Sequence, residues 1–320
     1  MSSRRVLGIL AQVVALGAGG WFLLRTAAAS WGTIALSDLR PAWLPIVVAS
    51  VLTAATYLFL VFLWVVSLRW WQERFPYLEA ARVWFVSNLA RFIPGMVWHL
   101  LGVAAMAQAR DLSPLAAAGG ILLQQFVLVL TALVVAAAWA PALLSGWARA
   151  IPAESLLALT GLGVALLVLV LPRAMPLMGR AVARVLRRPV SWPALPPGEF
   201  TLYVLGLCVP WVAYGIAFWL FGRGLLGTQA PSFPLAVGGY VASYVVGLIV
   251  VFAPSGLVVR EAAMVAALAP AIGGGAALVL AIASRVWLLM VELATALGVV
   301  LLHGVVHGRR PQGTSGAGRQ

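Results

Sequence analysis

Two proline-containing segments place the residues best suited to chemistry inside apolar stretches of the chain. The first reads Arg-Phe-Ile-Pro-Gly-Met-Val-Trp-His and covers residues 91–99, and the second reads Phe-Ala-Pro-Ser-Gly-Leu-Val-Val-Arg-Glu and covers residues 252–261. Proline removes a backbone donor and interrupts a helix, and in lipid the freed backbone groups must be satisfied by protein or by a wet cavity. Because ionisable side chains adjoin both breaks, the two segments predict a polar site within the membrane.

An anion site is the chemistry that the first segment favours. Arg91 and His99 flank the break at Pro94 and Gly95. Helix ends at a break expose unpaired N–H groups, and a nearby guanidinium, with its planar fork of donors, suits a phosphate diester. Arg91 could instead extend to the cytoplasmic interface. His99 could make a packing hydrogen bond or act as a proton relay.

Four further charged residues lie at membrane depth: Arg260, Glu261, Arg285 and Glu292. Each costs about 2.5–3.5 kcal/mol to insert, so each requires a partner or a function. Arg285 and Glu292 share a helix face but lie two turns apart, which is too far for an intrahelical ion pair. We therefore predict that Arg260 pairs with Glu292 and that Glu261 pairs with Arg285. The network could bind substrate or could serve only to fix helix packing.

Several other polar and aromatic residues have two plausible roles. Gln124, beside Gln125 in the middle of an apolar stretch, could face the site or form a hydrogen bond between helices. Ser87 and Asn88 precede Arg91 by one turn and could line the same cavity. Aromatic side chains near predicted helix ends are typical interfacial anchors, and these are Trp84, Trp98 and Tyr77. His303 and His307 have the spacing of a metal pair, but beside arginines at a helix end they favour interfacial solvation.

The composition indicates an integral membrane protein. Of the 320 residues 63% are hydrophobic and only 9% are charged, whereas a soluble domain carries about 25% charged residues. The net charge is +13, and the arginines cluster between apolar segments. Such clustering favours an orientation signal or contact with anionic lipid head groups, and we predict no nucleic-acid partner.

The fold class that follows is an all-α integral membrane protein with about six full transmembrane helices and two proline-broken re-entrant hairpins. The predicted helices cover residues 6–24, 43–67, 115–139, 156–171, 200–222 and 276–302. The predicted hairpins cover residues 83–108 and 235–272. Residues 235–253 could alternatively cross the membrane completely.

Arginine-rich stretches set the predicted orientation. The N-terminus and the stretches 69–82 and 173–188 should be cytoplasmic under the positive-inside rule. The number of crossings between them then requires that the two hairpins enter from opposite faces. The halves 43–139 and 200–302 would therefore form an inverted repeat within one membrane domain, which covers residues 1–307. We predict that the protein lies in the cytoplasmic membrane and that residues 308–320 form a disordered cytoplasmic tail.

At the two proline segments the chain resembles the transmembrane region of lysylphosphatidylglycerol synthases, a group of flippase-like membrane proteins that also occur alone. The family pattern is aromatic-Ile-Pro-Gly-x-x-Trp in the first half and Pro-Gly-Gly-hydrophobic-Gly-x-Arg-Glu in the second. Ser255 and Val258 stand where the family has glycines. The residues that fall on motif positions are Arg91, Pro94, Gly95, Trp98, Pro254, Gly256, Arg260 and Glu261.

The resemblance implies the lipid-handling half of these proteins without the synthase domain, and hence a translocase for a phospholipid or a lipid-linked head group. The candidate substrate-binding residues are Arg91, Pro94, Gly95, Trp98, His99, Gln124, Pro254, Gly256, Arg260, Glu261, Arg285 and Glu292. We predict no catalytic residue, no metal and no cofactor, because no recognisable catalytic or nucleotide-binding motif is present. The alternatives are a membrane-embedded transferase acting on lipid carriers and a non-catalytic assembly partner in the cell envelope.

Overall fold

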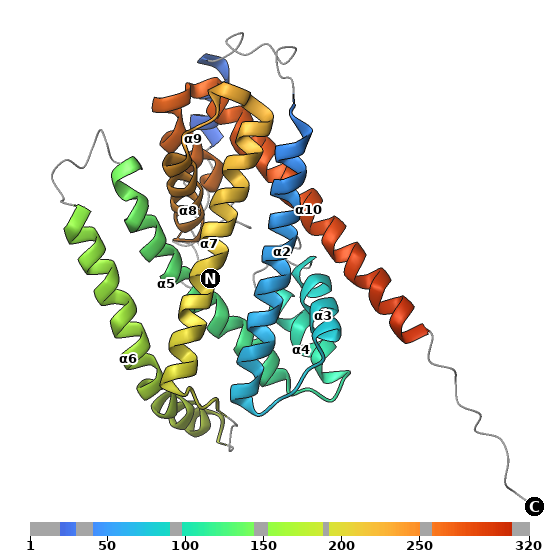
Figure 1. Ribbon diagram of the computed structural model, residues 1–320. Helices are drawn as coiled ribbons and strands as arrows, with labels where there is room; N and C mark the ends of the chain where they lie inside the picture. Colours follow the sequence, from blue (N-terminus) through green and yellow to red (C-terminus); the bar gives the residue numbers. More distant parts are fainter. Residues whose placement is uncertain are drawn as a thin grey trace, which may run out of the picture.

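Helices make up the described part of the molecule. The computed structural model describes residues 20–29, 41–89, 98–143, 153–187, 192–249 and 258–308 (Figure 1). Within these ranges there is no β-strand, and five helices are long and apolar enough to cross a membrane. The chain is therefore an all-α membrane protein, as its composition predicted.

Five of the six predicted spans correspond to long helices. These are α2 (Trp43–Leu68), α5 (Pro114–Leu143), α6 (Ala153–Leu186), α7 (Pro197–Leu226) and α10 (Gly274–Gly308). The sixth predicted span, 6–24, lies mostly outside the described residues, although residues 20–29 are helical. The predicted tail also lies outside them, except for Gly308 at the end of α10.

Helix α6 extends well beyond the predicted span. It continues to Leu186 and so includes Arg173 and Arg180, which lie beyond the predicted span of 156–171. Arginine is a good helix former, so the basic stretch does not end the helix. Pro172 and Pro176 lie inside α6, and its last turns bend away from the axis of the earlier turns (Figure 1). Proline is the usual cause of such a bend.

Four shorter helices form two antiparallel pairs. The first pair is α3 (Tyr77–Leu89) and α4 (Trp98–Gln108). Glu79 near the start of α3 contacts Arg110 just after α4, whereas Ser87 near the end of α3 lies against Gly102 in α4. A Cβ atom on Gly102 would lie 3.3 Å from the Ser87 Cβ, so glycine permits this close approach. The outer ends of α3 and α4 therefore lie together.

The second pair is α8 (Phe233–Ile249) and α9 (Val259–Ile272). Gly247 near the end of α8 faces Arg260 at the start of α9, and Gly239, about two turns earlier in α8, faces Leu268. A Cβ atom on Gly247 would lie only 3.0 Å from the Arg260 Cβ. Since α8 has 17 residues, it is about 25 Å long, which is shorter than a usual span.

The helix packing has the same pattern in both halves of the chain. Helices α2 and α7 pack along each other. Helix α5 packs against the α8 of the other half, just as α10 packs against α3. Likewise α5 contacts α7 as α10 contacts α2, and α4 contacts α5 as α9 contacts α10. Each short pair is thus held by long helices from both halves.

Buried hydrogen bonds join the long helices at the core. The indole of Trp64 in α2 donates to the Ala117 carbonyl oxygen in α5 at 3.2 Å. The indole of Trp211 in α7 donates to the Leu128 carbonyl oxygen, also in α5, at 3.0 Å. Both tryptophans are fully buried, and polar contacts of this kind help to hold helices together in lipid. The core therefore centres on α2, α5 and α7.

Candidate functional site

The structure describes about half of the predicted site. Five predicted residues lie outside the described ranges: Arg91, Pro94, Gly95, Pro254 and Gly256. Trp98 begins α4, but its side chain is also outside the described set. His99 lies in the first turn of α4 and is partly buried. The remaining predicted residues belong to α5, α9 and α10.

Arg260 contacts two aromatic rings and does not contact its predicted carboxylate partner. Its guanidinium carbon is 5.0 Å from the ring centre of Tyr240 and 5.5 Å from that of Tyr244, both in α8. No carboxylate of the described residues is within ion-pair distance of Arg260, so the predicted pair with Glu292 is wrong. The antiparallel packing of α9 on α8 directs Arg260 to the two tyrosines. A guanidinium over tyrosine faces is stabilised as a cation, and after its hydrogen bond with Tyr240 it has further N–H donors for other partners.

The second predicted ion pair is confirmed. Arg285 Nη1 in α10 donates to Glu261 Oε1 in α9 at 2.5 Å. The Glu261 side chain is only 10% exposed, whereas that of Arg285 is 29% exposed. The other carboxylate oxygen of Glu261, Oε2, is buried without a hydrogen-bond partner among the described residues. Arg285 therefore binds one oxygen of the carboxylate, and the other oxygen has no hydrogen-bond partner among the described residues.

Glu292 connects α10 to the first short pair. Asn88 Nδ2 in α3 donates to Glu292 Oε1 at 2.6 Å, and Glu292 is 1% exposed. Arg285 and Glu292 lie seven residues apart and therefore nearly on one helix face. Helix α10 thus presents one polar face that contacts α9 through Arg285 and α3 through Glu292. Asn88 thus contacts a predicted site residue, whereas the cavity that it could share with Arg91 lies outside the described residues.

A row of aromatic rings runs between the two short pairs. Trp84 in α3 is 6.3 Å from Tyr57 in α2, and Tyr57 is 5.9 Å from Tyr214 in α7, measured between ring centres. Tyr214 is 6.0 Å from Tyr240, whose ring adjoins Arg260. Trp84 is buried and so is not the interfacial anchor that the sequence analysis expected. Sequence reasoning did not select the tyrosines, although the four-residue spacing of Tyr240 and Tyr244 on one helix face was a visible signal.

Gln124 has a structural partner. Its side-chain Nε2 donates to the Leu60 carbonyl oxygen in α2 at 2.8 Å, and the residue is 5% exposed. The amide therefore joins α5 to α2, in agreement with the alternative of an interhelical hydrogen bond. This contact accounts for a buried polar side chain in the core.

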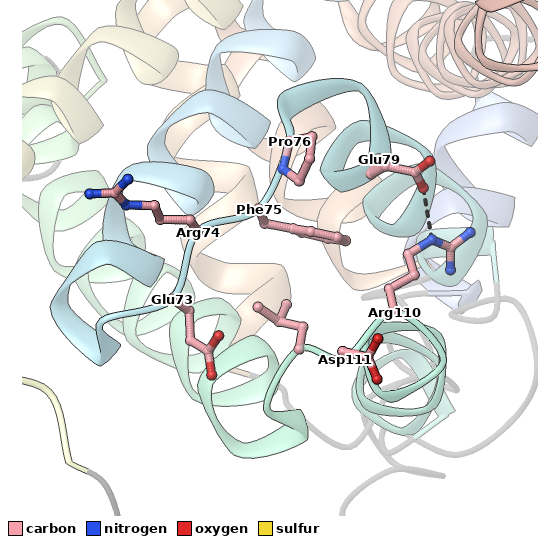
Figure 2. Close-up of a pocket in the computed structure, with 8 residues that line it drawn as sticks. Glu73, Arg74, Phe75, Pro76, Glu79, Arg110 and Asp111 are labelled. Atoms are coloured by element: carbon pink, nitrogen blue, oxygen red, sulfur yellow. Dashed lines mark hydrogen bonds and ion pairs between the residues drawn. The ribbon is translucent and has the colours of Figure 1, made fainter. Parts of the chain in front are cut away.

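A pocket of about 400 Å³ lies at the outer ends of α3 and α4, away from the predicted site. Its lining consists of Glu73, Arg74, Phe75, Pro76, Glu79, Arg110, Asp111 and Leu112. Figure 2 shows Phe75 extending across the pocket, with the Glu79–Arg110 pair on one side and Arg74 pointing away on the other. Sequence reasoning missed this pocket, because its residues come from the loop before α3, the first turn of α3 and the loop after α4, which only the packing of α3 on α4 brings together.

Glu79 joins three parts of the chain at this pocket. It pairs with Arg110 Nε at 2.7 Å and with His303 Nε2 in α10. Burial raises the pKa of Glu79, but hydrogen bonds and charge from His303 and Arg110 outweigh burial and leave the pKa below its ordinary value. The His303 side chain is only 12% exposed, so the expected interfacial solvation of this residue is replaced by a contact with Glu79.

The lowered pKa of Glu79 predicts a pH-dependent loss of stability in Glu79→Gln. The carboxylate stabilises the folded state at pH values above its ordinary titration range, and this contribution disappears as the pH falls through the lower folded-state pKa. Near neutral pH the variant should lose about 1–3 kcal/mol, the usual value of hydrogen bonds to a charged group. Thermal unfolding at a series of pH values measures the difference, which should shrink on acidification below about pH 4.

Asp111→Asn is the matched control for this prediction. Asp111 lines the same pocket, is exposed and makes no ion pair with any described residue. Its substitution should leave the pH dependence of unfolding unchanged. A Glu79→Gln variant with the same pH profile as the wild type would contradict the role given to Glu79.

The site as described offers cationic and phenolic groups to a ligand. Among residues with described positions, no three His, Cys, Asp or Glu side chains form a group that could hold a metal ion. Guanidinium groups with free donors bind phosphate and carboxylate through paired hydrogen bonds, and tyrosine hydroxyls can add a further donor. The chemistry that the geometry supports is therefore recognition of an anion.

Comparisons with known proteins identify no relative from which a function could be transferred, so the function is argued from the geometry of the site. No family model matches the chain, and no curated protein matches it.

Proposed function

We propose that the protein is a multi-pass membrane translocase for a phospholipid or a lipid-linked head group. The observation that carries the proposal is Arg260, a partly buried cation that two tyrosine rings hold and that no described carboxylate neutralises. A charge at membrane depth requires compensation, and a phosphate monoanion supplies it. The guanidinium fork is also shaped to bind such a phosphate through two parallel hydrogen bonds.

The arrangement of the short helices supports this proposal. We interpret α3–α4 and α8–α9 as two re-entrant hairpins that enter from opposite faces, because the outer ends of the two pairs lie at opposite ends of the helix bundle (Figure 1). Equivalent helices of the two halves make equivalent contacts, and this correspondence supports an inverted repeat of 43–139 and 200–302. Inverted repeats with interrupted helices are a recurring transporter design, with the substrate site near the middle of the membrane.

The resemblance to the lysylphosphatidylglycerol synthase membrane region supports the same proposal. We place six spans in the cytoplasmic membrane, with a cytoplasmic N-terminus and the arginine-rich end of α6 on the same side. In this proposal Arg91, Pro94, Gly95, Pro254 and Gly256 supply the inner ends of the hairpins. Trp98 and His99 would begin the helix that follows the first break.

The proposed mechanism places the phosphate of the substrate at Arg260 and Arg285. The tyrosines of α8 hold Arg260 in place, and the acyl chains remain in the surrounding lipid. Glu261 and Glu292 keep the buried charge balanced while the site is without substrate. Access would alternate when one hairpin shifts against the other around the same anion site.

A leaflet-protection assay tests the proposal. The purified protein is reconstituted in liposomes that contain fluorescent phosphatidylglycerol, and dithionite then destroys the fluorophores of the outer leaflet. Translocation predicts that more than the outer-leaflet fraction is lost, whereas protein-free liposomes should keep the inner fraction. Protection equal to that of protein-free liposomes would refute the translocase. A labelled product that forms only when a group donor is added would instead indicate a transferase.

A further inference from the structure

The buried carboxylate of Glu261 binds the guanidinium of Arg285, which in the proposed function also binds the phosphate of the substrate. Its Oε1 accepts a hydrogen bond from Arg285 Nη1 at 2.5 Å. The side chain is nine-tenths buried, and Oε2 makes no hydrogen bond to any residue with a described position. Arg285 is the more exposed partner of the pair, so part of its side chain is accessible to an anion. Glu261 and the phosphate therefore compete for one guanidinium.

Few other charges surround Glu261 among the residues that the structure describes. On α9 its neighbour Arg260 faces the aromatic rings of Tyr240 and Tyr244 in α8. On α10 Arg285 binds Glu261, and the hydroxyl of the adjacent Ser284 donates to the Ala281 carbonyl oxygen. Glu292 lies two turns further along α10 and binds Asn88. Of the described cations, Arg285 alone lies within ion-pair distance of Glu261.

Displacement of Glu261 from Arg285 would leave a buried carboxylate with no ion-pair partner among the described residues, since Arg260 attracts it only at longer range. A buried charge without a partner is strongly unfavourable, and such a group becomes neutral instead. We infer that Glu261 takes up one proton when a phosphodiester monoanion binds to Arg285. The proton comes from hydronium or a buffer acid in the bulk water: one bond to hydrogen breaks in the donor, one O–H bond forms on the carboxylate, and no other covalent bond changes. This inference rests on the proposed function, because it requires the anion site of that proposal.

The inferred coupling determines which gradient can drive transport. One negative charge enters the site with the phosphodiester and one positive charge enters with the proton, so the net charge of the site does not change. Transport of the phosphodiester together with the proton then moves no net charge across the membrane. A pH difference should drive translocation of the lipid, whereas a membrane potential should have no direct effect on it.

Calorimetry in two buffers counts the protons directly. The full-length protein in detergent is titrated with dihexanoyl phosphatidylglycerol at pH 7, in buffers that differ in their enthalpy of ionisation. The wild type should take up about one proton per bound lipid, by linkage of proton and ligand binding. Glu261→Gln should bind the lipid without proton uptake, because glutamine cannot titrate. Glu154→Gln, at an exposed position in the first turn of α6, is the matched control and should keep the wild-type proton count.

Two further measurements keep the outcomes distinct. Glu261→Asp retains a carboxyl group and should retain proton uptake, and thermal unfolding of each variant shows whether it is folded. Leaflet-protection assays are then run with a pH gradient and, separately, with a potassium diffusion potential. Lipid binding or translocation without proton uptake overturns the inference while the translocase stands. Proton uptake on binding, with no translocation under any gradient, overturns the translocase instead, and absence of any lipid binding overturns the inference.

Discussion

Replacing Arg260 with glutamine is expected to lower the rate of phospholipid translocation by about 30- to 150-fold. The guanidinium should donate charge-assisted hydrogen bonds to the phosphate, and the loss of about 2–3 kcal/mol of such bonding corresponds to that factor. The substitution removes the contacts of Arg260 with Tyr240 and Tyr244 but breaks no ion pair with any described residue, so we expect the variant to fold. The leaflet-protection assay gives the rate, and thermal unfolding shows whether the variant is folded.

Two variants sharpen this prediction. Arg260→Lys keeps the charge but lacks the planar fork, so it should translocate faster than Arg260→Gln and more slowly than the wild type. Arg223→Gln removes an arginine from an exposed position in the last turn of α7 and should translocate at the wild-type rate. Wild-type translocation by Arg260→Gln would remove the main support for the proposed function.

Reversal of either charge in the Glu261–Arg285 pair is expected to destabilise the protein by about 3–5 kcal/mol, the usual cost of leaving one buried charge unpaired. Arg285→Glu would place two carboxylates against each other, and Glu261→Arg would place two guanidinium groups together. The double variant, Glu261→Arg with Arg285→Glu, restores opposite charges at the same contact and should recover most of the lost stability. Thermal unfolding and the monodispersity of the detergent-solubilised protein measure the recovery.

The same double variant separates a packing role from a binding role. If the pair only holds α9 to α10, recovered stability should bring recovered translocation. If Arg285 also binds the phosphate, translocation should stay low because the cation has moved to α9. Arg180→Glu, on the exposed side of α6, is the control for charge reversal in general. Equal instability of the single and double variants would show that this contact does not determine the packing of the two helices.

Much of the fold follows from the cost of placing polar groups in lipid. An apolar stretch of about 20 residues must span the membrane as a helix, and this requirement predicted α2, α5, α6, α7 and α10. The same cost predicted that Glu261 and Arg285 would each pair with a residue on another helix, and the two residues form an ion pair with each other. The end of α6 was not predicted, because a helix can continue past the apolar region when arginines extend into the interface.

The sequence by itself determined which segments enter the membrane and which side chains need compensation there, because both depend on composition and on the local chain. Only the tertiary structure decided how that compensation is made. It directed Arg260 to tyrosines on α8, Glu292 to Asn88 on α3, and Glu79 to His303 on α10. These contacts join residues far apart in the chain, and their geometry depends on how the faces of two helices pack. Several partners satisfy a charge almost equally well, so packing of the whole bundle selects among them.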